Sequence, residues 1–286
     1  MPPTLEYIIA KILSMRPELT REDLMKMIEE KVKLAGGFLT RESAALSLAA
    51  EMGVTIESNL RYEMLIKDLV SGLRSVTVTG RVIYVSQLKR FSRLDGVERG
   101  KRDMCIADNT GVAKIILWDD KAASASPESL IDNIVRLSRL SVRRRAGGNL
   151  ELNAGPRSIM EINPVGVKSS DYPPLTLFTK KIDELPQCSG KTINVLGLIE
   201  RIYPITIFRR QNGAEGRVRR AEIADRAGKA TLVLWDNCAD LLSESHVGKY
   251  AIAFWVRVRE RFDGRFELHS GNKTQIIVIE REPSGF

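Results

Sequence analysis

The sequence is poor in the residues that build metal centres and catalytic sites. Its 286 residues include three cysteines and two histidines. No two cysteines form a CxxC pair and no histidine lies near one at ligand spacing, which argues against a zinc ribbon or finger. His246 and His269 have no nucleophile as a partner, and no GxxxxGK[ST] phosphate loop occurs. We therefore expect no enzymatic activity, no metal and no cofactor.

Long hydrophobic runs are also missing. The opening stretch MPPTLEYIIAKILSMRP is interrupted by Glu6 and Lys11, so it fits neither a signal peptide nor a membrane span. The three isolated thiols fit a reducing compartment. These features predict a cytoplasmic protein without a membrane partner.

Basic charge is present in excess, and it is concentrated in two segments. The chain has a net charge of +8. Residues 86–102 hold six basic and two acidic residues, and residues 204–220 hold five basic residues and one acidic residue, so each segment contributes +4. Such local, repeated basicity favours a polyanionic partner.

The hydrophobic period changes along the chain. Residues 4–53 show the spacing of three short helices, with Thr20 and Thr40 as N-caps. From about residue 75 the period becomes two, and we expect strands over 76–85, up to 108, 112–118, 134–144 and 150–159. Residues 86–101 are expected to form a long polar loop. The Ser126-Pro127 pair predicts a short helix between the third and fourth strands.

The strand pattern occurs twice. Residues 76–122 align without a gap to residues 193–239, with 16 identities in 47 positions. Matched positions include Gly80/Gly197, Phe91/Phe208, Arg102/Arg219, Asp108/Asp225 and Trp118/Trp235. A duplicated domain is the simplest source of such a repeat. We predict a mainly β protein with two tandem five-stranded OB-fold barrels behind a small helical domain, divided as 1–58, 59–166 and 167–286, with residues 168–178 as an extended linker.

Aromatic residues beside the basic segments are candidates for stacking on unpaired bases. Trp118 and Trp235 end their strands on the face opposite the uniformly apolar one, which predicts that they lie outside the barrels. In the last long strand, residues 252, 254, 256 and 258 should face inward and residues 255, 257 and 259 outward. The full set of stacking candidates is Trp118, Trp235, Phe91, Phe208, Phe262 and Trp255. The alternatives are that each tryptophan packs under the following helix and that the phenylalanines fold back onto their own sheets.

The same segments supply candidate phosphate contacts, because Lys and Arg neutralise a nucleic-acid backbone. The candidates are Lys89, Arg90, Arg93, Lys101, Arg102, Arg143, Arg144, Arg145, Arg209, Arg210, Arg217, Arg219, Arg257 and Arg259. The run Arg143-Arg144-Arg145 fits a solvated edge equally well. Recurring aspartates such as Asp108 and Asp119 are expected to bond turn backbone rather than to hold metal.

The chain resembles archaeal replication protein A. The resemblance rests on LIKDLVSGLRSVTVTGRV, on the two D…G.A…LW segments, on VRVRERFDGRFELHS and on the helical stretch GGFLTRESAALSLAAEMGV. It implies sequence-tolerant binding of single-stranded DNA in replication, repair and recombination, with Trp118, Trp235, Phe91 and Phe262 at the stacking positions. Two departures stand out: the loop RRRAGGNLEL has no aromatic residue, and the cysteines of the zinc motif that many relatives carry are missing.

The resemblance also implies partners. Residues 1–58 are candidates for recruiting replication or repair proteins, and a homo- or hetero-oligomer is compatible with the pattern. Three alternatives remain: single-stranded RNA as the ligand, an adaptor whose barrels dock proteins, and, more distantly, a metal-dependent nuclease.

Overall fold

The structure is a computed structural model that describes residues 5–34, 40–54, 63–92, 96, 98–145, 147 and 149–286. It divides into two compact units, residues 1–64 and 65–286. None of the described helices combines the length and the apolar character that a membrane span requires.

The first unit contains three helices around one apolar core. They are α1 (Leu5–Met15), α2 (Arg21–Leu34) and α3 (Arg41–Glu51). The predicted caps are confirmed: the Thr20 hydroxyl accepts from the Asp23 backbone N–H at 3.2 Å, and the Thr40 hydroxyl accepts from Ser43 N–H at 3.2 Å. These bonds satisfy N–H groups that a helix start otherwise leaves without partners. The core is formed by Ile8, Ile9, Ile12, Leu24, Ile28, Ala44, Ala45, Leu48, Ala49 and Val54.

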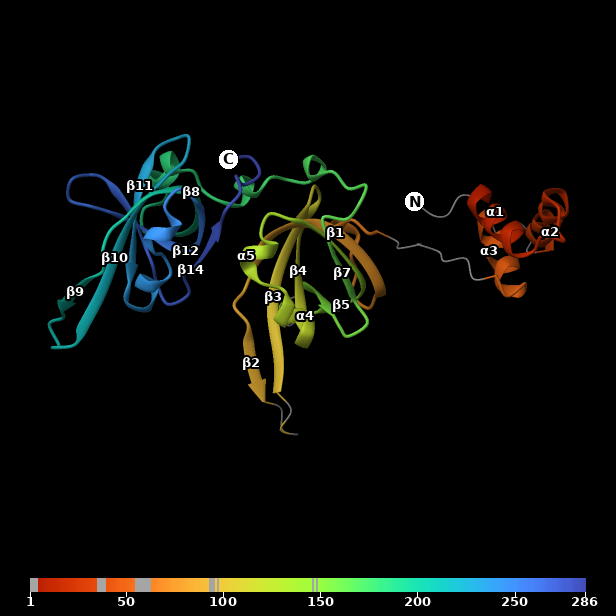
Figure 1. Ribbon diagram of the computed structural model, residues 1–286, viewed down its shortest axis with the longest axis horizontal. Coiled ribbons are helices and arrows are strands. Elements are labelled where there is room, and N and C mark those ends of the chain that lie inside the picture. Colours follow the sequence, from red (N-terminus) through yellow and green to blue (C-terminus); the bar gives the residue numbers. More distant parts are fainter. Residues whose placement is uncertain are drawn as a thin grey trace. The chain divides into compact units, whose positions relative to one another are not determined.

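The second unit begins with a closed barrel. Its elements are η1 (Ile66–Asp68), β1 (Arg74–Val85), β2 (Lys89–Ser92), β3 (Glu98–Asp108), β4 (Gly111–Trp118), α4 (Asp119–Ser124), α5 (Pro127–Leu130), β5 (Ile134–Arg144), β6 (Leu150–Ala154) and β7 (Ile159–Ile162). The order β1-β3-β4-β6-β5 closes through a β1–β5 pairing, and β4 runs parallel to β6. This is the predicted five-stranded barrel, with helices between its third and fourth strands (Figure 1).

A second barrel follows with the same order of pairing. Its elements are η2 (Ser169–Asp171), η3 (Leu175–Phe178), η4 (Ile182–Cys188), β8 (Thr192–Ile202), β9 (Thr206–Arg209), β10 (Glu215–Ala224), β11 (Lys229–Trp235), η5 (Asp236–Asp240), η6 (Glu244–His246), β12 (Tyr250–Glu260), β13 (Phe266–His269) and β14 (Gln275–Ile279). The ring is β8-β10-β11-β13-β12, closed by β12–β8, with β11 parallel to β13. The predicted fold of two OB-like barrels behind a helical region is confirmed.

Repeated residues of the alignment hold equivalent points of the two barrels. A Cβ on Gly80 would stand 2.8 Å from the carbonyl oxygen of Ala107, and one on Gly197 would stand 3.2 Å from that of Ala224. A side chain at Gly80 would therefore clash with the second strand, and one at Gly197 would force that strand to shift, so the glycines let the first strand of each barrel coil tightly against the second. Asp108 and Asp225 each accept backbone N–H bonds from the following turn, as expected for turn aspartates.

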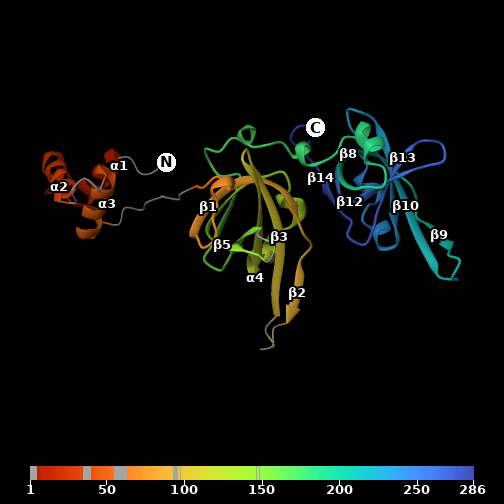
Figure 2. The same ribbon diagram turned by 180° about the vertical axis from the view of Figure 1, so that it is seen from behind.

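The predicted loop 86–101 is a β-ribbon instead. β2 pairs with the first residues of β3, Phe91 opposite Arg99, and β9 pairs with β10 in the same way, Phe208 opposite Gly216. Both ribbons project beyond their barrels (Figure 1, Figure 2). The sequence did not predict these strands, because a ribbon with both faces in solvent needs no alternation of apolar and polar residues.

The expected fifth strand, 150–159, is also interrupted. β6 stops at Ala154, a turn closes between Gly155 and Ser158, and β7 then pairs with β5 rather than continuing along β4. Pro156 lacks the N–H that a continuing ladder needs, which explains the break.

A bulge in β12 overturns part of the expected assignment of that strand: Val256 and Val258 face the core and residues 255, 257 and 259 are exposed, as expected, but residues 252 and 254 are not where they were expected. The register shifts between Ala253 and Val256, and Trp255 has a positive φ of 54°. Its N–H donates to the Asn194 side chain at 3.1 Å instead of to a strand carbonyl. An inserted residue of this kind reverses which side chains face inward. The residues that line the core are Ala251, Ala253, Val256 and Val258.

Ile252 and Phe254, which were expected inside, therefore lie on the other face of β12. Phe254 is buried there against the first barrel, with its ring centroid 5.1 Å from that of Tyr84. On the neighbouring strand, Gln275 donates to the Val85 carbonyl oxygen at 2.8 Å. The two barrels thus share a packed junction.

A buried ion pair of the first barrel also contacts the linker and the C-terminal segment. Arg81 on β1 bonds Asp132 at 2.9 Å, and both side chains are under 5 % exposed. Arg81 also donates to carbonyl oxygens of Ser169 and Pro173, while Asp132 accepts from the backbone N–H of Ser284 at 2.9 Å. The linker is therefore folded into short 3-10 turns and bonded to the first barrel, rather than extended.

Candidate nucleic-acid interface

Each barrel presents a phenylalanine and a tryptophan edge to face. Phe91 on β2 meets Trp118 at the end of β4, with ring centroids 6.4 Å apart and planes at 76°. Phe208 on β9 meets Trp235 at the end of β11, at 5.8 Å and 80°. The pairing is possible because each ribbon folds over the end of the barrel's third strand, and it occurs at the same alignment positions in both repeats.

The aspartate after each tryptophan fixes the direction in which the strand ends. Asp119 and Asp236 both have positive φ, 50° and 51°, a conformation that Asp tolerates better than most residues. The Asp119 carboxylate accepts from the Gly100 backbone N–H at 3.2 Å, and Asp236 accepts from Arg217 N–H at 3.2 Å. The repeated Trp-Asp pair is thus an anchor for the indole.

The indole N–H groups are held by residues that the repeat alignment missed. Trp118 donates to Asn153 at 3.3 Å, and Trp235 donates to Nδ1 of His269 at 3.0 Å. Asn153 and His269 occupy equivalent places on β6 and β13. The gapless alignment ended at residue 122 because the connection after β11 is one residue shorter than that after β4, so these positions match at an offset of 116.

The tryptophans remain partly accessible. Phe91 is 41% exposed, and Trp118 is partly buried, whereas Ile116, two residues earlier in the same strand, is fully buried. A cleft of about 590 Å³ lies over this pair, lined by Phe91, Trp118, Arg99, Arg143, Asn153 and Pro156, among others. An indole whose edge is fixed and whose face borders a cleft can stack on a flat ring.

Phe208 sits on a glycine in the second barrel. A Cβ on Gly216 would stand 2.3 Å from Cζ of Phe208, so the ring occupies that space. In the first barrel the cross-strand partner of Phe91 is Arg99, which leaves Phe91 more exposed. The aromatic ring covers a glycine that would otherwise weaken the ribbon.

We predict that Gly216→Val moves Phe208 away from Trp235. One aromatic pair contributes about 0.5–1.5 kcal/mol. Its loss should therefore lower the affinity for an unpaired nucleic-acid strand roughly 2- to 10-fold, which fluorescence titration measures. Gly271→Ala is the matched control, because its Cβ would meet no atom within 4 Å. Equal affinities for the two variants would contradict the role of Phe208.

His269 stacks near Trp235, with centroids 6.0 Å apart and planes at 24°. Burial lowers the pKa of His269, although Glu267 at 3.2 Å opposes that shift. The neutral imidazole keeps Nδ1 as the acceptor for the indole, which protonation would remove.

Stability of the second barrel should accordingly fall with acidification. Because the folded pKa lies below the unfolded value of about 6.5, the contribution of His269 is complete above that value and is lost as pH falls toward the folded pKa. Urea unfolding at about pH 7.5 and pH 5.5 measures this loss. His269→Asn, which installs the first barrel's residue, should show a smaller loss; an equal loss would assign the pH dependence to other groups.

The predicted phosphate contacts fall into three groups. The first group is exposed and forms no ion pair within the part of the chain that the structure describes: Lys89, Arg143, Arg144, Arg209, Arg257 and Arg259. The second group is paired with a carboxylate but keeps solvent-accessible surface: Arg90, Lys101, Arg145, Arg210 and Arg217. Arg93 lies outside the described residues.

Arg102 and Arg219 form the third group and are a correction. Arg102 is 8% exposed and donates to the carbonyl oxygens of Ser86 and Ala122, at 2.8 and 2.6 Å. Arg219, its repeat counterpart, donates to the Leu242 carbonyl oxygen. Arg102 lies on β3 and Arg219 on β10, the second strand of each barrel, and each bonds the segment that follows the third strand. We therefore remove both from the phosphate contacts.

The two remaining aromatic candidates differ in their surroundings. Phe262, in the turn after β12, is fully exposed, so it does not fold back onto its sheet. Trp255 is 38% exposed and packs beside Tyr84, with ring centroids 4.9 Å apart. Among the described residues, no group of three His, Cys, Asp or Glu side chains is placed to hold a metal ion.

The curated proteins that match this chain are both named as replication factor A or a subunit of it. No family model matches the chain. It is 32% identical over 220 residues to replication factor A of Methanothermobacter thermautotrophicus, covering 73% of this chain, and 31% identical over 136 residues to a probable replication factor A 73 kDa subunit of Caenorhabditis elegans, covering 46%. The chain spans 27% and 20% of the lengths of these relatives.

A solved structure supports the fold. A chain of a replication protein A heterotrimer bound to single-stranded DNA superposes with a TM-score of 0.52 at 15% identity, covering 76% of this chain and 51% of that one. At this identity the similarity concerns the arrangement of barrels rather than individual contact residues.

Proposed function

We propose that this chain, a homologue of archaeal replication factor A over 73% of its length, binds single-stranded DNA largely without sequence preference. The resemblance indicated by its motifs is confirmed by that identity. The observation that carries the proposal is the repeated Phe–Trp pair, Phe91 with Trp118 and Phe208 with Trp235, at the base of a basic ribbon in each barrel.

In this mechanism the rings stack on bases and the cations neutralise phosphates. Every base has a π face, so stacking tolerates any sequence. Phe262 and Trp255 supply further rings, and the exposed Lys and Arg residues contact the backbone. Lys101 already lies 5.8 Å from the Trp118 ring, and Arg210 lies 5.8 Å from that of Phe208, so each pair is adjacent to a cation.

We propose that the three predicted domains have different roles. Barrels 59–166 and 167–286 hold the strand, and residues 1–58 recruit replication or repair proteins. We assign no enzymatic role, because the recurring aspartates bond backbone N–H groups instead of converging on one point.

Titration with oligo-dT, matched duplex DNA and oligo-U across a salt series tests the proposal, with tryptophan fluorescence as a second readout. If about six phosphates are neutralised, log K should fall with log salt with a slope of roughly −4. Binding to oligo-dT no tighter than to duplex, without quenching, would overturn it. Equal affinity for oligo-U would assign the site to single-stranded nucleic acid in general.

A further inference from the structure

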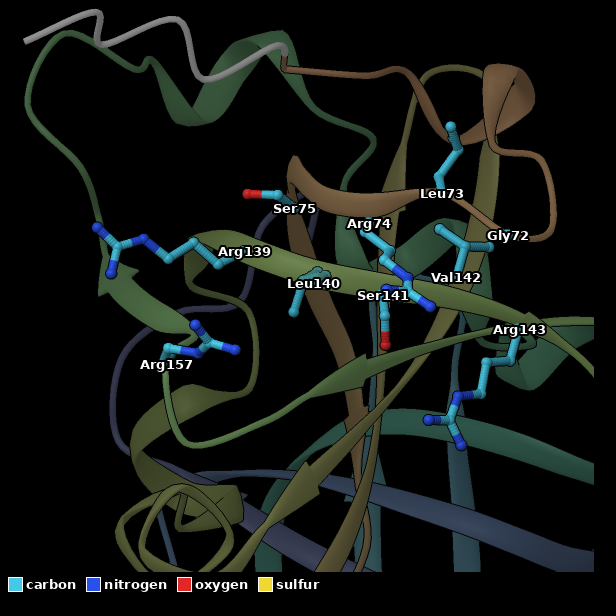
Figure 3. A pocket seen from close by; sticks show the side chains of 10 residues that line it. All are labelled: Gly72, Leu73, Arg74, Ser75, Arg139, Leu140, Ser141, Val142, Arg143 and Arg157. Atoms are coloured by element: carbon cyan, nitrogen blue, oxygen red, sulfur yellow. The ribbon is translucent and has the colours of Figure 1, made fainter.

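A second pocket opens on the first barrel beside the aromatic cleft. It lies between the start of β1 and the middle of β5 and has a volume of about 600 Å³. Four arginines line it: Arg74, Arg139, Arg143 and Arg157. Figure 3 shows Arg139 and Arg157 at one end and Arg143 at the other, with Arg74 between them. The lining contains no acidic residue.

Two residues of this pocket have an unusual backbone. Arg139 has φ 58° and Ser75 has φ 63°, although neither is glycine. Arg139 occupies the place in β5 that Trp255 occupies in β12, so the bulge belongs to both barrels while the side chain it presents differs. Positive φ at a non-glycine residue costs energy and is concentrated at functional sites.

The positive charges of the pocket are not balanced within the protein. Among the described residues, none of the four guanidinium groups forms an ion pair or a hydrogen bond. Like charges that share a pocket repel one another, and a bound anion relieves that repulsion. The planar fork of N–H donors on arginine matches the oxygens of a phosphate better than a lysine does.

The pocket borders the aromatic cleft. Ser141 and Arg143 line both cavities. Arg143 therefore lies between the Trp118 cleft and the pocket that contains Arg139 and Arg157.

We propose that this arginine pocket binds backbone phosphates of the same single strand, so that the track of the first barrel continues past the Phe91–Trp118 pair over β5. The inference rests on the proposed function and names a further part of that site. We favour a nucleic-acid backbone over an acidic peptide because the pocket shares its wall with a cleft built for flat rings.

The test compares Arg139→Gln/Arg157→Gln with the full wild-type chain in oligo-dT titrations over a salt series. Removing two phosphate contacts should lower the magnitude of the salt slope by about 1.4, because each contributes roughly 0.7 on a single strand. Affinity should fall most at low salt, and tryptophan quenching at saturation should be unchanged. Arg139→Lys/Arg157→Lys should keep most of the slope.

A control variant separates the pocket from general charge loss. Arg226→Gln/Lys249→Gln also removes two positive charges, from exposed ion pairs with Glu282 and Glu280. Arg226 lies in the turn at the end of the β10–β11 hairpin opposite Trp235. An equal change in slope for this control would overturn the inference, as would an unchanged slope in the pocket variant.

The outcomes also distinguish this inference from the proposed function. Failure of the wild-type chain to bind oligo-dT would overturn both. Tight wild-type binding with an unchanged pocket variant would overturn the pocket alone, and a simultaneous loss of binding to poly-glutamate by that variant would assign the pocket to an acidic protein.

Discussion

Replacing Trp118 or Trp235 with alanine should weaken binding to oligo-dT by roughly 5- to 150-fold each, because one base stack is worth about 1–3 kcal/mol. The two indoles lie in separate barrels, so the losses in the double variant should approximately multiply. Equilibrium titration at fixed salt measures the effect, and the loss should persist at high salt because stacking, unlike phosphate contact, is not screened.

Trp→Phe variants at the same positions are the matched controls. Phenylalanine keeps a ring but lacks the indole N–H that Asn153 or His269 holds, so its loss should be intermediate. Retained affinity in both alanine variants, with unchanged circular dichroism, would show that the tryptophans only support the ribbons.

Breaking the buried Arg81–Asp132 pair should cost about 3–5 kcal/mol of unfolding free energy, because it leaves a charge without its partner in the interior. Asp132→Gly is the suitable change, since Asp132 has φ 63° and glycine adopts that conformation without strain. Urea unfolding followed by circular dichroism measures the loss.

Two variants make this result specific. Arg81→Met combined with Asp132→Gly should recover part of the stability, because no orphaned charge remains. Glu282→Ala removes the exposed partner of Arg226 and should cost less than about 1 kcal/mol. Similar losses for Asp132→Gly and Glu282→Ala would show that the buried pair is not a structural anchor.

The repeat identified the aromatic pairs of the proposed site from the sequence, because residues shared by both barrels remain recognisable at a fixed offset. Trp118/Trp235 and Phe91/Phe208 were found in this way, and so was the strand glycine Gly80. An identical residue in both repeats does not show, however, whether its side chain faces the interior or the solvent. Arg102 and Arg219 both bond backbone carbonyl oxygens of their own barrels, and the sequence alone cannot separate that role from phosphate contact.

Features that depend on pairing between strands were missed. The bulge at Trp255 needs two residues of β12 opposite one of β8, and that count exists only once the sheet is formed. The same reason hid the pocket around Arg139. Asn153 and His269 were missed because a one-residue difference between the repeats breaks the register of a gapless alignment.

The bonds of Asp132 have a consequence for synthesis on the ribosome. Its carboxylate is completed by Ser284, 152 positions later in the chain. During translation the first barrel's strands can pair long before that residue leaves the exit tunnel. Until Ser284 is synthesised, the Asp132 carboxylate of the nascent first barrel lacks the bond from a residue that follows the strands of the second barrel.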